Sequence, residues 1–186
     1  MVVDDLGPER PAARRRRATR GFVLWPSALL AAWVVWWVAS TATSLRAYSI
    51  PTGSMAPALK PGDRVGVMTQ PRNGPRRGEI WIFRMPPASK LTGSDGAKRV
   101  IGLPGETIEV VGGRVLINGT PLAEPYLSGS MTYSIPPVTL APGEYFVLGD
   151  SRNNSHDSHV WGPLPANHLV GPVKVRYWPI GRAGGF

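Results

Sequence analysis

The sequence predicts a mainly β protein: a compact antiparallel β domain with many loops, preceded by one N-terminal transmembrane helix. The 186 residues include 20 Pro and 22 Gly, yet 42% are hydrophobic, which favours short strands and many turns over disorder. After residue 45 the apolar stretches are short and end near Gly or Pro. Before it, one long apolar run carries no charge, which predicts the helix.

The first 45 residues divide into a basic tail and an anchor. Residues 1–20 hold six of the 21 basic residues and are predicted to form a disordered cytoplasmic tail. Residues 21–45 contain no charge, and a helix of that length, rising about 1.5 Å per residue, exceeds a hydrocarbon core of about 30 Å. By the positive-inside rule the arginines stay cytoplasmic, which places residues 46–186 on the extracytoplasmic side of the cell membrane.

A cleaved secretory signal is the alternative interpretation of this run. Such signals have an apolar region of roughly 7–15 residues, and residues 40–42 resemble a cleavage site only loosely. The length of the run and its content of Trp and Val favour the anchor. The net charge of +9 then points to anionic lipid headgroups, not to nucleic acid, as the partner of the basic tail.

Residues 46–186 are predicted to form one domain with a single core. The pairs Gly112-Gly113 and Asn118-Gly119 are typical of tight hairpin turns and predict a β-meander. Residues 86–97 and 121–142 are predicted to be loops that frame a cleft. Strands are predicted at residues 64–68, 79–85, 99–103, 107–111, 114–117, 145–148 and 173–178.

The chemistry must use groups other than thiols, because the chain has no cysteine. Ser54 follows Gly53, which would let the backbone turn and present both the serine hydroxyl and its amide. A serine hydroxyl becomes a good nucleophile only when a partner takes its proton. A lysine is one candidate partner, and the three histidines near the C-terminus, His156, His159 and His168, are the others.

Lys98 begins the stretch KRVIGLPGE, where it adjoins an apolar run. Apolar surroundings remove water from the ammonium group and lower the pKa of a lysine. The ordinary value is about 10.4, so a lysine that acts as a base near neutral pH needs a pKa roughly two lower. A solvated lysine at the start of a strand is the alternative interpretation.

Taken together, four stretches behind one anchor resemble the type I signal peptidase family, membrane-bound serine proteases with a Ser-Lys dyad. IPTGSMAPALKPGDRVGV matches the serine box of the family, RRGEIWIF its strand box, KRVIGLPGETIEV its lysine box and GDSRNNSHDSHVWGPLP its C-terminal box. The resemblance extends from about residue 49 to residue 165.

The resemblance implies a role for each matching residue. Ser54 would be the nucleophile and Lys98 the general base, and the oxyanion would be held by the Ser54 amide and the Thr52 hydroxyl. Ser155 and Asp157 would orient the lysine.

Further positions follow from the same resemblance. Asp150 and Arg152 would be structural polar residues. Asp150 would pair with Arg99 and so aim Lys98 inward; the alternative is a surface pair worth under about 1 kcal/mol. The residues implied for substrate binding, with core packing as the alternative, are Ile50, Met55 and Leu59.

The implied function is removal of signal peptides from secreted preproteins after a small-x-small site, through an acyl-enzyme at the outer membrane face. No metal or organic cofactor is implied, and the sequence shows no metal-ligand spacing. The lipid bilayer is the second implied partner, contacted either by Trp81, Phe83 and Met85 or by Tyr177 and Trp178, with core burial as the alternative.

The chain departs from the family pattern at three places. His159 stands where members often carry Arg, and Asn153 where they often carry Asp, so the ion pairs of the C-terminal box can differ. Residues 95–97, Asp-Gly-Ala, are less bulky than usual, so the substrate-facing wall can differ too.

Three alternatives remain at this stage. A Ser-Lys dyad on a related fold also serves self-cleaving repressors, which the anchor disfavours, and specialised peptidases of conjugation or pilin processing, which the full set of boxes disfavours. The third is an anchored, non-enzymatic β domain that binds envelope partners.

Overall fold

The computed structural model describes residues 24–42, 44–69, 71–127 and 129–186, and it divides into two units. Helix α1, Leu24–Ala42, lies in the first unit except for its last two residues. Among the described residues, none of the helices combines the length and the hydropathy that crossing a membrane requires. The predicted tail, residues 1–20, and residues 21–23 and 43 of the predicted anchor lie outside the described residues.

The second unit is built from two sheets whose described strand pairs are all antiparallel. The predicted antiparallel β domain is therefore confirmed. The larger sheet has eight strands in the order β1-β2-β11-β3-β4-β9-β10, with β12 paired to β11. Its strands are β1 Leu45–Ser49, β2 Arg64–Met68, β3 Ile80–Arg84, β4 Asp95–Gly102, β9 Glu144–Leu148, β10 Leu164–Pro165, β11 Leu169–Trp178 and β12 Gly184–Gly185.

Strand β11 joins the two halves of the larger sheet. Its residues 169–172 pair with β3, and its residues 173–178 pair with β2. At the changeover, a Cβ atom on Gly171 would lie 1.9 Å from the Met68 carbonyl oxygen, so the close approach of the two strands requires glycine. Among the described residues, β2 and β3 do not pair with each other, and each pairs with β11.

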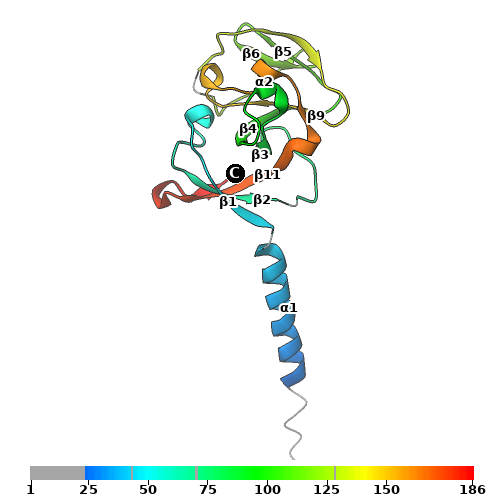
Figure 1. Ribbon diagram of the computed structural model, residues 1–186, viewed down its shortest axis with the longest axis vertical. Helices are drawn as coiled ribbons and strands as arrows, with labels where there is room; N and C mark the ends of the chain where they lie inside the picture. Colours follow the sequence, from blue (N-terminus) through cyan, green and yellow to red (C-terminus); the bar gives the residue numbers. More distant parts are fainter. Residues whose placement is uncertain (1–23, 43, 70, 128) are drawn as a thin grey trace, which may run out of the picture. The chain divides into compact units, whose positions relative to one another are not determined.

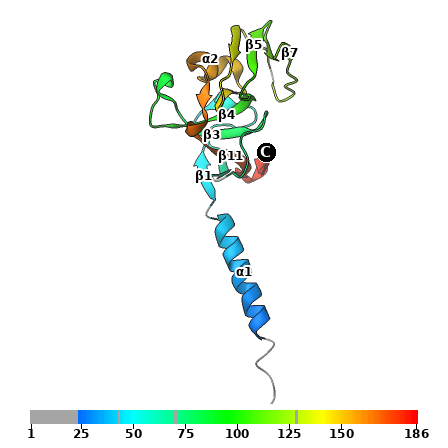
Figure 2. The same ribbon diagram turned by 90° about the vertical axis from the view of Figure 1, so that its right-hand side faces the viewer.

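The smaller sheet lies at the end of the unit opposite β1 and β2 (Figures 1 and 2). Both predicted hairpin turns are confirmed, because Gly112, Gly113, Asn118 and Gly119 all have positive φ, at 56°, 75°, 50° and 77°. The strand order is β7-β6-β5-β8. The bounds are β5 Thr107–Val111, β6 Arg114–Ile117, β7 Thr120–Pro121 and β8 Ile135–Thr139.

The seven predicted strands are all present, and β2, β5 and β6 have the predicted bounds. Two predictions need correction. Strand β4 begins at Asp95, so the predicted loop 86–97 ends earlier and Lys98 lies inside a strand. The predicted loop 121–142 contains β8, whose two prolines are tolerated because it is a terminal strand of its sheet.

The short helices connect strands, and the two sets of residues considered for lipid contact differ in burial. Trp81, Phe83 and Met85 are only 3%, 0% and 7% exposed, so these three residues pack in the core and are not the lipid-contacting set. Tyr177 and Trp178, by contrast, are 42% and 50% exposed. The short helices are η1 Gly53–Met55, η2 Pro87–Ser89, η3 Arg152–Asn154, α2 Ser158–Trp161, η4 Ala166–His168 and η5 Ile180–Arg182.

Candidate active site

Ser54 lies in the single turn of η1, which follows β1. The turn is fixed from both sides: Met55 is 1% exposed in the core, and the Ser151 N–H donates to the Ser54 carbonyl oxygen at 3.0 Å. Gly53 has no positive φ, and a Cβ atom there would meet only open space. The glycine turn expected from the sequence is therefore not what positions the serine; the buried methionine and the backbone hydrogen bond hold it.

Lys98 brings its amine to the serine from strand β4. Its Nζ atom lies 2.6 Å from Ser54 Oγ, although 44 positions separate the two residues in the sequence. The residue is 6% exposed, and burial lowers the pKa of Lys98 to about 8, while the Asp157 and Asp150 carboxylates act in the opposite direction. At mildly alkaline pH a large fraction of this amine is neutral and within proton-transfer distance of the hydroxyl.

The serine and the lysine open into a cleft of about 480 Å³. One wall is formed by residues 48–55 and the other by residues 94–98. Within the described residues, β1 pairs with β2 alone, and residues 95–98 of β4 pair with β3 alone because the pairing with β9 starts at Arg99. Both walls thus present strand edges, which are surfaces to which an extended peptide can hydrogen-bond.

The side chains expected to bind substrate are only partly on this cleft. Ile50 and Met55 line it, and both also belong to the adjacent hydrophobic core cluster. Leu59 is fully buried in that cluster and does not line the cleft, so core packing accounts for it. The Thr52 hydroxyl lies on the cleft, 3.3 Å from Ser54 Oγ.

Ser155 lies close to Gly149, which in turn lies close to Ser54. A Cβ atom on Gly149 would lie 2.2 Å from Ser155 Oγ and 2.5 Å from the Ser54 carbonyl oxygen. The Ser155 Oγ atom is buried and has no hydrogen-bond partner among the described residues. A buried hydroxyl of this kind is costly unless it takes a partner at some stage of function.

Asp157 is fully buried and accepts three hydrogen bonds. One carboxylate oxygen accepts from Gly149 N–H at 2.8 Å. The other accepts from His159 N–H at 3.1 Å and lies 2.8 Å from His159 Nδ1. The His159 ring stacks on Tyr133, with ring centroids 4.3 Å apart.

Arg99 and Asp150 form the expected pair, and it is buried. Arg99 Nε and Nη2 donate to the two Asp150 carboxylate oxygens at 2.8 and 2.5 Å, while Nη1 donates to the Gly78 carbonyl at 2.7 Å. The Tyr126 ring lies 3.9 Å from the Arg99 guanidinium carbon. The pair fixes the residue that follows Lys98 in β4.

Arg152 is 3% exposed and forms an ion pair with Glu124, which sequence reasoning missed along with Tyr126. Arg152 also donates to the Gly149 carbonyl at 3.1 Å. It thereby links Glu124, in the segment between β7 and β8, to the loop that carries Ser155. The available signal was indirect: a buried arginine in the C-terminal box needs a carboxylate, and Asp150 is occupied by Arg99.

The three histidine rings have hydrogen-bond partners other than Ser54. His156 Nε2 lies 2.9 Å from the Ser89 carbonyl, and His168 Nδ1 lies 3.0 Å from the Arg84 carbonyl. His159 contacts Asp157. In the part of the chain that the structure describes, no three His, Asp or Glu side chains gather as a set of metal ligands.

Comparison with known proteins identifies the family of this chain. The sequence matches the family described as signal peptidase, peptidase S26, over residues 22–178. It is 45% identical over 141 residues to a signal peptidase I of Leptolyngbya laminosa, covering 73% of this chain and 70% of that protein. A probable signal peptidase I-1 of Synechocystis sp. is 42% identical over 141 residues, covering 73% of this chain and 72% of the relative. A crystal structure of a signal peptidase I from Enterococcus faecalis V583 has 33% sequence identity and a TM-score of 0.47, over 54% of this chain and 97% of that chain. The chain thus belongs to the signal peptidase family, peptidase S26.

Proposed function

We propose that this serine endopeptidase removes N-terminal signal peptides from secreted preproteins as a signal peptidase I, with Ser54 as its nucleophile and Lys98 as its general base. The observation that carries the proposal is the 2.6 Å approach of the buried Lys98 amine to the Ser54 hydroxyl, at a cleft whose two walls each present a free strand edge. Membership of the family supports the same reaction.

Acylation begins when Ser54 Oγ attacks the carbonyl carbon of the scissile peptide bond. The hydroxyl proton moves to Lys98 Nζ, and negative charge collects on the carbonyl oxygen. The Ser54 N–H and the Thr52 hydroxyl, which lies 3.3 Å from Ser54 Oγ, are the two donors proposed to receive that charge; one such donor is typically worth about 10² to 10³ in rate. The Lys98 ammonium then gives its proton to the leaving amine, which is the new N-terminus of the mature protein.

Deacylation uses the same groups in the reverse direction. Lys98, again neutral, takes a proton from water, and the hydroxide oxygen attacks the acyl carbon on Ser54. Collapse of the intermediate breaks the ester bond, Ser54 Oγ regains a proton from Lys98, and the signal peptide leaves with a new carboxylate. The steps need only side chains, backbone amides and water.

The residues around Lys98 prepare it for this work. The Ser155 hydroxyl, buried and unpartnered among the described residues, is the group proposed to take up the lysine amine as it reorients during the cycle. The Asp157 carboxylate, through Gly149, holds the backbone against which Ser155 and Ser54 pack. The Arg99–Asp150 pair fixes the strand position next to the lysine.

Substrate is proposed to bind as an extended strand between the two cleft walls. Ile50 and Met55 bound the pocket beside Ser54, which limits the side chains before the scissile bond to small ones. The less bulky stretch 95–97 forms the facing wall.

Cleavage of a purified preprotein tests the function directly. With Ala one and three residues before the bond, we expect a single cut at that site. With Phe at the position directly before the bond, we expect at least about 100-fold slower cleavage, because the ring has no space beside Ile50 and Met55. N-terminal sequencing of the product identifies the cut. Equal cleavage of both substrates, or cleavage by a matched Ser54→Ala protein, contradicts the proposal.

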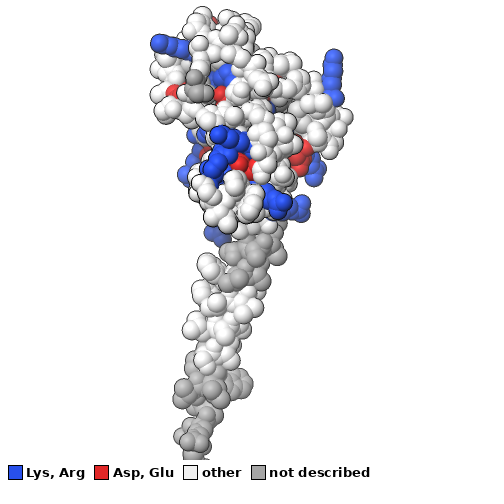
Figure 3. Space-filling view, turned by 90° about the vertical axis from the view of Figure 1, so that its left-hand side faces the viewer, with Lys and Arg blue, Asp and Glu red and all other residues white. Residues whose placement is uncertain are grey.

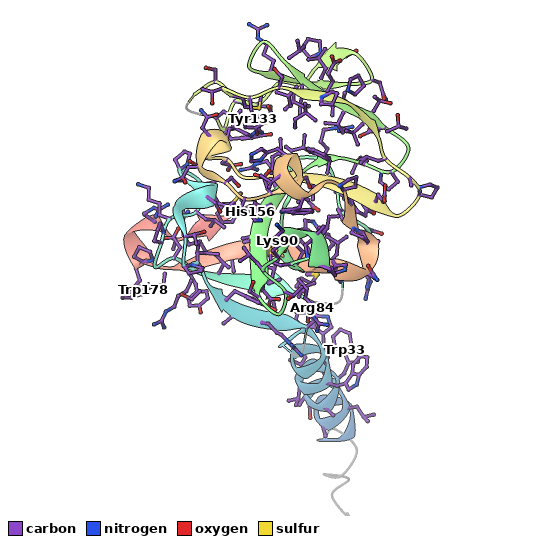
Figure 4. The ribbon with its side chains drawn as sticks, turned by 45° about the horizontal axis from the view of Figure 1, so that its top comes forward. Trp33, Arg84, Lys90, Tyr133, His156 and Trp178 are labelled. Atoms are coloured by element: carbon purple, nitrogen blue, oxygen red, sulfur yellow. The ribbon has the colours of Figure 1, made fainter. Side chains whose placement is uncertain are left out.

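The family is membrane-associated, and we propose that residues 21–45 anchor the chain with its N-terminus cytoplasmic and its β domain extracytoplasmic. A second contact is proposed on the β domain itself. Trp178, which projects at the periphery (Figure 4), adjoins Tyr177, Ile180 and the exposed Arg64. Lys and Arg side chains gather on the face in Figure 3. The pairing of Arg64 with Trp178 brings a positive charge next to an exposed aromatic side chain.

Binding to lipid vesicles tests this second contact. A chain lacking residues 1–45 is expected to sediment with vesicles that contain anionic lipid. Replacing Tyr177 and Trp178 with Ser should reduce that binding at least about tenfold, because the exposed aromatic surface is lost. Failure of the unsubstituted chain to bind such vesicles would reject the contact, and leaves the anchor to be tested by alkaline extraction of membranes.

A further inference from the structure

His159 and Asp157 form a hydrogen-bonded pair beside the proposed dyad. Asp157 caps α2: one carboxylate oxygen accepts from His159 N–H at 3.1 Å and lies 2.8 Å from His159 Nδ1. The other oxygen accepts from Gly149 N–H at 2.8 Å. The Asp157 side chain is fully buried, whereas 20% of the His159 side chain is exposed. The imidazole is therefore the part of the pair that water can reach.

The pair acts on the dyad both by contact and by charge. Gly149, which Asp157 holds by its amide, packs against the Ser155 hydroxyl and the Ser54 carbonyl oxygen. The Asp157 carboxylate also favours the charged form of Lys98, more strongly than any other group does. Any change in the effective charge of this carboxylate therefore changes the balance between the charged and the neutral form of Lys98.

The other groups around the pair are a neutral phenol and two ion pairs. Tyr133 stacks on His159 (Figure 4 labels Tyr133), and burial raises the pKa of Tyr133 to about 12, so this phenol stays neutral over the working range. The charged groups nearby already have partners: Arg152 with Glu124, and Arg99 with Asp150.

We propose that His159 is a positioning residue for the dyad: through its hydrogen bonds to Asp157, it sets how much of that carboxylate's field reaches Lys98. A cationic side chain at position 159 would offset the carboxylate and so favour the neutral amine that accepts the serine proton. An uncharged side chain that still donates to Asp157 would orient the carboxylate but leave its full charge acting on the ammonium. This role rests on the proposed function, since it requires Lys98 to be the base.

Two substitutions separate the charge of residue 159 from its hydrogen bond. His159→Arg is cationic throughout the accessible range, and His159→Gln can donate without a charge. Each full-length protein is assayed in detergent on an internally quenched peptide with an Ala-x-Ala site, and kcat/KM is followed from about pH 5 to about pH 10. We expect the acidic limb to lie lower for His159→Arg than for His159→Gln by about half a pH unit or more, which is about threefold in rate on the acidic side.

His168→Gln is the matched control, because the His168 ring contacts the Arg84 carbonyl and not Asp157. Its profile should coincide with that of the wild type. A variant that is merely less stable loses rate at every pH and does not move the limb. Coincident limbs for the two His159 variants, a lower limb for His159→Gln, or loss of all activity in both with wild-type unfolding temperatures would each overturn the role of His159. If the wild type cleaves while the limbs coincide, this role alone fails; if Ser54→Ala still cleaves, the proposed function itself fails.

Discussion

Lys98→Met is expected to lower kcat/KM for a preprotein by at least about 10³-fold, because it removes the group proposed to take the serine proton while filling nearly the same buried volume. The wild-type rate should rise with pH up to about 8, where the Lys98 amine loses its proton. The variant should lack this acidic limb. Rate measurements across the pH range check both expectations.

Lys98→Met should lower the rate without lowering the stability of the protein. Burial lowers the pKa of Lys98 to about 8 from its ordinary value of 10.5, so between these two pH values the folded state binds fewer protons than the unfolded state and stability rises with pH. Below about pH 8 the folded protein bears the full cost of the buried charge, up to roughly 3 kcal/mol. Lys98→Met removes this cost, so its unfolding temperature at neutral pH should not fall.

The exposed Lys60 gives the control for this pair of measurements. Lys60→Met should leave rate, pH profile and unfolding temperature near those of the wild type. Substantial activity in a folded Lys98→Met protein would rule out this lysine as the base.

Gly149→Ala is expected to lower kcat/KM by at least about 100-fold and to destabilise the protein by about 1–3 kcal/mol. The new methyl group would lie 2.2 Å from Ser155 Oγ and 2.5 Å from the Ser54 carbonyl oxygen. That carbonyl is held by the Ser151 N–H, so the backbone cannot move away without losing a hydrogen bond. The nucleophile, the neighbouring hydroxyl or both must shift.

Gly181→Ala is a suitable companion, because a Cβ atom at that position meets nothing within 4 Å. Its kinetics and its thermal unfolding should match those of the wild type within about 0.5 kcal/mol. A Gly149→Ala protein with wild-type kcat/KM and unfolding temperature would show that the loop yields more easily than its contacts indicate.

Local chemistry made much of the fold predictable. The Gly-Gly and Asn-Gly pairs specify turns with positive φ, and the strands that flank them, β5 and β6, have the bounds that the apolar pattern indicates. Strand β8 escaped because its two prolines resemble a loop; only its place as a terminal strand, which depends on the whole sheet, makes them acceptable.

The candidate site divides in the same way. Ser54 and Lys98 could be selected because few residue types can form such a pair and both stand in recognisable stretches. Glu124 and Tyr126 could not be selected from the sequence. Their partners, Arg152 and Arg99, lie 28 and 27 positions away, and the contacts depend on how distant segments of the chain pack together. Leu59 fits a pocket by its position in the sequence, but in three dimensions it packs behind the cleft.

The place of β11 has a consequence for when activity arises during folding. The segment with the nucleophile extends from β1 and β2, the lysine lies on β4 next to β3, and β11, residues 169–178, stands between these two halves. A chain without residues 169–178 would keep Ser54 and Lys98 but lose the strand that pairs with both β2 and β3. We therefore expect the two proposed catalytic residues to work together only after a strand that follows both of them in the sequence has joined the sheet.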